Sequence, residues 1–153
     1  MRGIGFQDSG QTVPLPNDAM FRIASVTKPI TAAAIRHLIG TGALSLSDAI
    51  FDVGQSGGGI LNSAPFPSLG DRRLDDITVE HLLLHQGGWD RDLLGLDLTF
   101  LELSIASDMG IESPPSRIDP VRWIMGQPLQ FAPGTQTVYS NISFLLLGLS
   151  WSK

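Results

Sequence analysis

The chain of 153 residues contains no cysteine, which excludes disulfide bonds and thiol nucleophiles. It contains one tyrosine and only two lysines. No apolar run reaches the ~18 residues that a membrane-spanning helix needs. Positive charge is scarce as well, because ten Lys and Arg residues stand against 15 Asp and Glu and give a formal net charge of −5. This acidic balance disfavours a nucleic-acid partner.

The scarcity of tyrosine and lysine draws attention to two short motifs. Residues 25–28 read Ser-Val-Thr-Lys and follow a strand-like segment, residues 21–24. Residues 139–141 read Tyr-Ser-Asn and follow a Phe-Ala-Pro-Gly turn at residues 131–134. The only tyrosine and the only internal lysine therefore both lie in these motifs. They are the two residue types here best suited to take a proton from a serine hydroxyl.

The Ser-x-x-Lys pattern alone is weak, because the chain has 15 serines and residues 150–153 match it too. The first match is followed by an alanine-rich helical stretch, which places Ser25 at a helix start. Lys28 then lies on the same face and reaches the Ser25 hydroxyl, while a backbone N–H and the positive helix end face a bound acyl oxygen. Because Pro29 opposes regular helical geometry, we expect a strained first turn.

The two candidate bases, Lys28 and Tyr139, would both be protonated at pH 7 if their pKa values were unperturbed. Unperturbed lysine and tyrosine have pKa values near ~10.4 and ~10, so burial or a neighbouring charge must lower them. We expect Lys28 and Tyr139 to share the Ser25 proton as a coupled pair in one cleft. Asn141 points its amide at the substrate or holds Lys28, and the sequence leaves both open. Singly, Ser25 also fits a helix cap and Tyr139 a core aromatic; their joint occurrence favours catalysis.

Two other constellations are weaker. Residues 54–58 fit the Gly-x-Ser-x-Gly nucleophile elbow, but a run of three glycines disfavours the helix that must follow the serine. His81 and His85 lie four residues apart on an expected helix. They lack the His-Glu-x-x-His pattern and a third ligand, so we interpret them as packed or capping residues rather than metal ligands.

Local signals predict a mixture of strands and helices. We expect a hairpin with residues 3–6 and 20–23 as its strands. Helices are expected at about residues 25–38, 79–85, 119–125 and 141–149, the second capped by Thr78 and the last strongly apolar. The acids at positions 90, 92 and 97 flank a tryptophan in an expected loop, and we interpret them as solvated.

Together the motifs resemble the active site of the serine β-lactamase-like hydrolases. That family is characterised by Ser-x-x-Lys together with a second polar motif. The Tyr-Ser-Asn motif resembles the class C β-lactamase branch, shared with D-alanyl-D-alanine carboxypeptidases and family VIII esterases. Residues 21–33, 82–88 and 131–142 resemble it further, so the resemblance covers about residues 3–149. It implies an α/β (α+β) fold of the β-lactamase/transpeptidase-like type, here a helical region plus the first strands of an antiparallel sheet.

The resemblance also implies the chemistry. Ser25 is then the acylated nucleophile, Lys28 and Tyr139 are its general base/acid partners, and Asn141 orients the substrate. The reaction is hydrolysis of an amide or ester through an acyl-enzyme, with no cofactor or metal. A β-lactam, a peptidoglycan stem peptide and a small ester remain open as small-molecule or peptide substrates, as do the oligomeric state and the localisation.

The third motif of that family, a Lys-Thr-Gly or His-x-Gly type strand, is not found in the sequence. We therefore expect residues 1–153 to be an N-terminal, partial β-lactamase-related domain. The alternative hypothesis is a truncated, non-catalytic remnant that at most binds such ligands. The family is often exported, but the first residues of this chain do not resemble a signal peptide.

Overall fold

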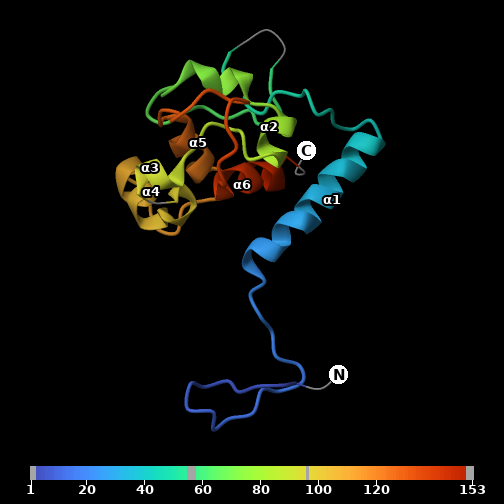
Figure 1. Ribbon diagram of the computed structural model, residues 1–153. Coiled ribbons are helices and arrows are strands. Elements are labelled where there is room, and N and C mark those ends of the chain that lie inside the picture. Colours follow the sequence, from blue (N-terminus) through green and yellow to red (C-terminus); the bar gives the residue numbers. More distant parts are fainter. Residues whose placement is uncertain (1–2, 55–57, 96, 151–153) are drawn as a thin grey trace.

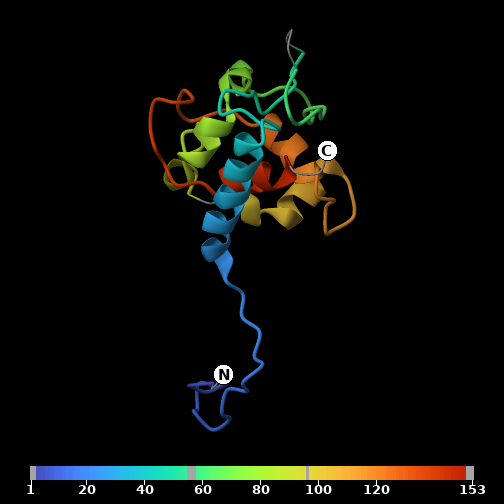
Figure 2. The same ribbon diagram turned by 90° about the vertical axis from the view of Figure 1, so that its right-hand side faces the viewer.

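The computed structural model describes residues 3–54, 58–95 and 97–150 of the chain. Its helices α2 to α6 gather into one body, α1 runs along one side of it, and α6 lies next to α1 in both views (Figures 1 and 2). Residues 3–20 form an extended loop away from this body in both views. None of the helices in the described ranges is long and apolar enough to cross a membrane.

The described residues form α-helices and short 3₁₀ helices, labelled η. In chain order these are η1 (Ala24–Val26), α1 (Thr27–Gly40), η2 (Arg72–Asp76), α2 (Val79–Leu83), α3 (Arg91–Leu94), η3 (Leu98–Phe100), α4 (Glu102–Met109), α5 (Asp119–Met125) and α6 (Asn141–Leu149).

Capping residues explain several of these boundaries. The expected cap at Thr78 is confirmed, because its hydroxyl accepts a hydrogen bond from the His81 backbone N–H at 3.3 Å. Helices α5 and α6 begin and end where the sequence predicts. Helices α3 and α4 were not predicted. Asp90 begins α3 by accepting hydrogen bonds from two backbone N–H groups of its first turn.

No strand forms in the residues that the structure describes, so the expected first strands of the sheet are not seen there. The expected pairing of residues 3–6 with 20–23 is replaced by a single antiparallel bridge between Phe6 and Pro14. The Asp8 carboxylate closes this shorter turn by accepting the Val13 N–H at 2.8 Å. A two-stranded hairpin without an apolar surface to pack on has little stability of its own, and Phe6 is half exposed.

The core surrounds α6, which packs against α1 and α2. Ile142, Leu146 and Leu147 of α6 are almost fully buried, as is Ile35 of α1. Each such side chain contributes about 1.5–3 kcal/mol relative to an exposed one. The core is completed by Ile50, Phe51, Leu61, Leu74, Ile77, Val79, Leu82, Trp89, Ile105, Val121, Trp123, Ile124, Met125 and Leu129. This core fixes the first turn of α6, which carries Asn141, against α1.

The loop after α2 and the segment before α6 are joined by backbone hydrogen bonds. The Gln86 carbonyl accepts from the Gly134 N–H at 2.9 Å, and the Gly88 carbonyl accepts from the Gln130 N–H at 2.8 Å. Gly134 has φ +77°, and a Cβ there would lie 2.9 Å from His81 Nε2. A glycine is therefore needed where the Phe-Ala-Pro-Gly turn passes α2. This junction places residues 138–141 beside α1.

Candidate active site

Ser25 lies in the middle of η1, directly before α1. Its predecessor Ala24 has φ +44°, a left-handed conformation that non-glycine residues rarely adopt and that costs of order 1–3 kcal/mol. Pro29 follows in the first turn of α1. The expected irregular helix start is therefore present, in the form of a 3₁₀ turn that ends where α1 begins.

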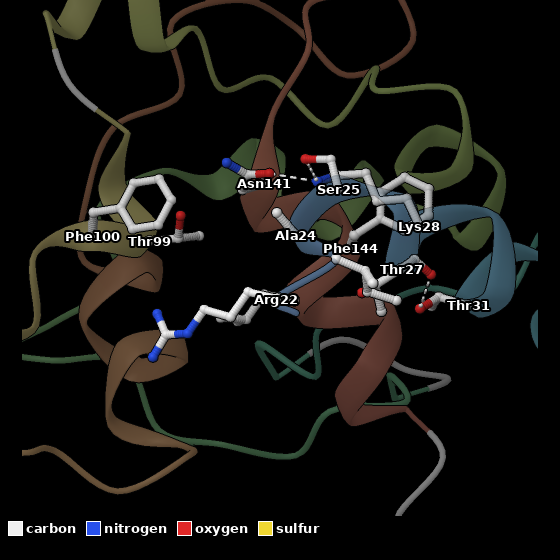
Figure 3. A pocket seen from close by; sticks show the side chains of 12 residues that line it. Arg22, Ala24, Ser25, Thr27, Lys28, Thr31, Thr99, Phe100, Asn141 and Phe144 are labelled. Atoms are coloured by element: carbon white, nitrogen blue, oxygen red, sulfur yellow. Dashed lines mark hydrogen bonds between the residues drawn. The ribbon is translucent and has the colours of Figure 1, made fainter. Parts of the chain in front are cut away.

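A cluster of polar side chains meets at the Ser25 hydroxyl. Ser25 Oγ lies 2.7 Å from Tyr139 Oη, and the Lys28 ammonium donates to Ser25 Oγ at 3.2 Å. Lys28 also donates to Asn141 Oδ1 at 2.5 Å, and the Tyr139 hydroxyl donates to the same oxygen at 3.2 Å. Figure 3 shows Ser25, Lys28 and Asn141 converging between α1 and α6. The structure thus brings together all four side chains that the sequence singled out.

The charge of Lys28 acts on Tyr139. The Lys28 ammonium lies 4.8 Å from the centroid of the tyrosine ring. Polar interaction with Lys28, and after it the hydrogen bond with Ser25, lowers the pKa of the Tyr139 phenol below its usual 10.0. A cation beside a phenol favours the phenolate, which is the form that accepts a proton. Arg91 lies on the ring as well, 5.2 Å from its centroid.

Asp97 reaches this cluster, although the sequence analysis interpreted it as a solvated loop residue. That interpretation was wrong, because Asp97 Oδ2 accepts a hydrogen bond from Asn141 Nδ2 at 2.7 Å. Its other oxygen accepts from the Thr99 hydroxyl at 2.6 Å. The Asn141 amide is thereby oriented with its nitrogen toward the carboxylate and its oxygen toward Lys28. An Asp-x-Thr cap signal at residues 97–99 was readable in the sequence; the contact with Asn141 was not.

The two histidines have the packed and capping roles expected of them. His81 Nδ1 faces the Thr78 N–H and completes the cap of α2. His85 packs its ring against Tyr139, with 4.8 Å between ring centroids. No group of three or more His, Asp or Glu side chains in the described part of the chain is arranged to hold a metal ion.

An open cleft of about 530 Å³ lies beside Ser25. Ser25, Lys28 and Asn141 line one side of it, and Thr99 and Phe100 of η3 line the opposite side (Figure 3). The remaining lining residues are Arg22, Ile23, Ala24, Thr27, Thr31, Phe144 and Leu145. Most of the lining surface is apolar, so the cleft fits a compact, largely apolar group next to a polar reacting centre.

A family model described as "Beta-lactamase" matches residues 1–150, nearly the whole chain. The chain belongs to the beta-lactamase family. The polar cluster at Ser25 is our candidate active site, and the family match covers all of the helices described above.

Curated relatives in this family carry different names. The chain is 32% identical to "Esterase EstB" of Burkholderia gladioli over 143 residues, which are 91% of this chain and 33% of that protein. It is 30% identical to "Protein flp" of Staphylococcus aureus (strain COL) over 149 residues, 97% of this chain and 26% of that protein. The chain thus spans between 26% and 33% of the length of these curated relatives.

Two alternative patterns lie partly outside the described residues. The Gly-x-Ser-x-Gly elbow at residues 54–58 has its central three residues outside the described ranges, and the second Ser-x-x-Lys match extends over residues 151–153, which also lie outside them. The first Ser-x-x-Lys match lies within the described ranges, and there its serine is in contact with Tyr139 and Lys28.

Proposed function

We propose that the protein is a serine hydrolase that forms an acyl-enzyme on Ser25 with an amide or ester substrate. The observation that supports this most directly is the short contact of 2.7 Å between Ser25 Oγ and Tyr139 Oη, with the Lys28 ammonium 3.2 Å from the same Oγ. A nucleophile in hydrogen-bond reach of a base, with a third group that tunes the base, is the arrangement that covalent catalysis requires.

In the proposed reaction, Tyr139 takes the serine proton. The Tyr139 phenolate accepts the proton of Ser25 as Oγ forms a bond to the substrate carbonyl carbon. The tetrahedral intermediate then collapses, the bond from that carbon to the leaving oxygen or nitrogen breaks, and the proton passes to the leaving group. Water then attacks the acyl carbon while Tyr139 accepts a proton from it. The bond from that carbon to Ser25 Oγ breaks, Tyr139 returns the proton to Oγ, and the acid product leaves.

Lys28 acts in this proposal as a cation rather than as the resting base. It donates hydrogen bonds to Ser25 Oγ and to Asn141 Oδ1, so a positive charge on it would act at short range on the reacting oxygen. Its charge favours the Tyr139 phenolate before the attack and the serine oxygen during it. The backbone N–H of Ser25, in the middle of the 3₁₀ turn η1 before α1, is our candidate for one oxyanion donor.

The apolar lining of the cleft supports a small ester as the substrate class. A small ester with an apolar acyl group fits the apolar lining around Phe100, Phe144 and Leu145. The name of the Burkholderia gladioli relative, an esterase, supports the same class. A β-lactam and a peptidoglycan stem peptide carry the same reacting carbonyl, and they are compared with the ester in the test below.

The test is covalent labelling of the full-length protein with a fluorophosphonate and with a fluorescent penicillin. Ser25→Ala should abolish labelling by both probes. Ser140→Ala, in the second motif, and Ser56→Ala, in the elbow pattern, are the matched controls and should still be labelled. Labelling that persists in Ser25→Ala would refute the assignment. Wild-type protein that neither probe labels, and that hydrolyses neither p-nitrophenyl esters nor D-Ala-D-Ala peptides, would favour the non-catalytic alternative.

A further inference from the structure

His85 occupies an unusual position in the loop that follows α2. Its backbone is left-handed, with φ +57°, and it is not a glycine. Such a conformation is strained for a residue with a Cβ and persists only where the surrounding contacts enforce it. Apart from its own N–H, which donates to the Leu82 carbonyl of α2 at 3.3 Å, the contacts described for His85 involve the segment that carries Tyr139 or the helix that follows it.

His85 holds the chain on both sides of Tyr139. Its carbonyl oxygen accepts a hydrogen bond from the Val138 N–H at 2.9 Å. Its ring atom Nδ1 accepts a second one from the Ser140 N–H at 3.3 Å. Its ring also packs against the ring of Tyr139 at 4.8 Å and that of Phe144 at 5.2 Å. The direction in which the Tyr139 hydroxyl points is therefore set by His85 through backbone and ring together.

The contact with Ser140 defines the protonation state of the ring. An imidazole nitrogen accepts a hydrogen bond only when it carries no proton, so Nδ1 is bare and a neutral ring carries its proton on Nε2. A second proton, on Nδ1, would turn an acceptor into a donor that faces the donating Ser140 N–H. The Ser140 contact would then be lost.

We propose that His85 is a positioning residue for the reaction at Ser25 and that it acts only as a neutral ring, so that its protonation displaces Tyr139 and slows acylation. The inference rests on the proposed function, because it concerns how Tyr139 is held against Ser25. It assigns to His85 no contact with the substrate.

The surroundings keep the ring neutral near pH 7. Burial first, and then the positive charge of Lys28 on α1, lower the pKa of His85 below its usual 6.5. The other elements packed on the ring contribute the phenol of Tyr139 and the apolar Phe144 of α6. Arg91 of α3 adds a further positive charge on the ring of Tyr139. A proton on His85 would therefore add a second positive charge close to that of Lys28.

The test compares two variants of the full-length protein over the pH range 4.5 to ~8 that brackets the ordinary histidine pKa. His85→Asn carries a side-chain oxygen near the place of Nδ1, tolerates left-handed backbone and does not titrate. His85→Leu removes the acceptor. We expect the leucine variant to acylate roughly 10- to 100-fold more slowly at pH 7.5, as misplacement of a reacting group does, and the asparagine variant to recover most of that loss.

The pH profile separates positioning from a merely structural role. As the pH falls below the His85 pKa, wild-type acylation should drop relative to that of His85→Asn, so that the ratio of the two rates falls. A constant ratio, an asparagine variant as slow as the leucine variant, or a leucine variant at the wild-type rate would each overturn the inference. Ser25→Ala, labelled in parallel, shows whether the proposed function itself fails.

A measurement without turnover covers the case in which His85→Leu does not fold. The ring of His85 can be titrated by NMR in wild type and in Lys28→Met. We expect a pKa below 6.5 in wild type, as burial and Lys28 dictate, and a higher one in Lys28→Met. A wild-type value above 6.5, or no change on removal of the lysine charge, would contradict the inference even if no acylation rate could be measured.

Discussion

Asn141 Nδ2 lies 2.7 Å from Asp97 Oδ2, across a sequence separation of 44 residues. Because the amide nitrogen faces a carboxylate, the amide oxygen is left for Lys28 and Tyr139. The sequence left open whether the Asn141 amide faces the substrate or holds Lys28. In the structure the amide oxygen contacts Lys28, because Asp97 binds the amide nitrogen.

Asp97→Asn should slow acylation. An asparagine retains an oxygen to cap η3, but its own amide nitrogen then faces Asn141 Nδ2, which places two donors together. Loss of a hydrogen bond to a charged group costs about 1.5–3 kcal/mol, which corresponds to roughly a 10- to 100-fold lower acylation rate. The acylation rate can be measured by stopped-flow spectroscopy with a chromogenic ester or β-lactam. Asp92→Asn, an exposed acid on α3, is the control and should change little; equal rates for both variants would contradict the role of Asp97.

Lys28→Met should move the pH dependence of acylation. A base works in its deprotonated form, so the acylation rate rises with pH through the pKa of Tyr139, which lies below 10.0 because of Lys28 and Ser25. Removing the cation raises this pKa, so the rise should shift to higher pH. The rate at pH 7 should fall by ~10²-fold or more, as it should in Tyr139→Phe, which removes the phenol.

Arg91→Met is the matched control for that shift. Arg91 lies 5.2 Å from the centroid of the Tyr139 ring but is the smallest of the causes that lower its pKa. Its removal should move the profile less than removal of Lys28 does. Lys28→Arg keeps the charge and should retain more activity than Lys28→Met. Equal losses in the two lysine variants would instead indicate that Lys28 itself gives up a proton.

Asp71→Asn should destabilise the fold at neutral pH. The Asp71 carboxylate bridges Arg73 at 2.6 Å and accepts the Leu129 N–H at 3.1 Å. Its loss should lower the free energy of unfolding by about 1–3 kcal/mol, as measured by urea denaturation at pH 7. Asp92→Asn, whose exposed pair with Arg91 contributes little, serves as the control.

The ion pair between Asp71 and Arg73 should also make the free energy of unfolding depend on pH. Arg73 lowers the pKa of Asp71 from 3.8 to about 2, so the folded state binds this proton less readily than the unfolded state. The stabilisation is present above pH 3.8 and is lost as the pH falls through about 2. The difference in unfolding free energy between wild type and Asp71→Asn should shrink over this interval. A difference that stayed constant would show that the carboxylate charge is not the cause.

Helices with strong local signals were predictable from the sequence. Proline beside the start of α5 and the apolar run of α6 set boundaries that the structure reproduces. Helix α3 was missed because an aspartate such as Asp90 looks the same in sequence whether it caps a short helix or lies in a loop. Helix α4 was missed because no side-chain cap marks its start at Leu101. The expected strands need a partner surface, and a local β pattern does not supply one.

For the candidate site, spacing along one helical turn was enough to place Lys28 near Ser25. The contact between Ser25 and Tyr139 joins residues 114 apart, and its expectation depended on the resemblance to a family rather than on any local signal. Asp97 was missed for a related reason. Its cap with Thr99 is local, whereas its second oxygen meets Asn141 only because the chain returns to the same place.

Two neighbouring residues on one side of the cleft, Thr99 and Phe100, differ in how freely they can be substituted. Phe100 is 78% exposed and lines the side opposite Ser25. Its neighbour Thr99 is bonded to Asp97, and through it to Asn141. If the proposed reaction takes place at Ser25, a mutant library that randomises position 100 would sample new shapes of that side of the cleft at little cost to reactivity. Randomising position 99 would change selectivity and reactivity together.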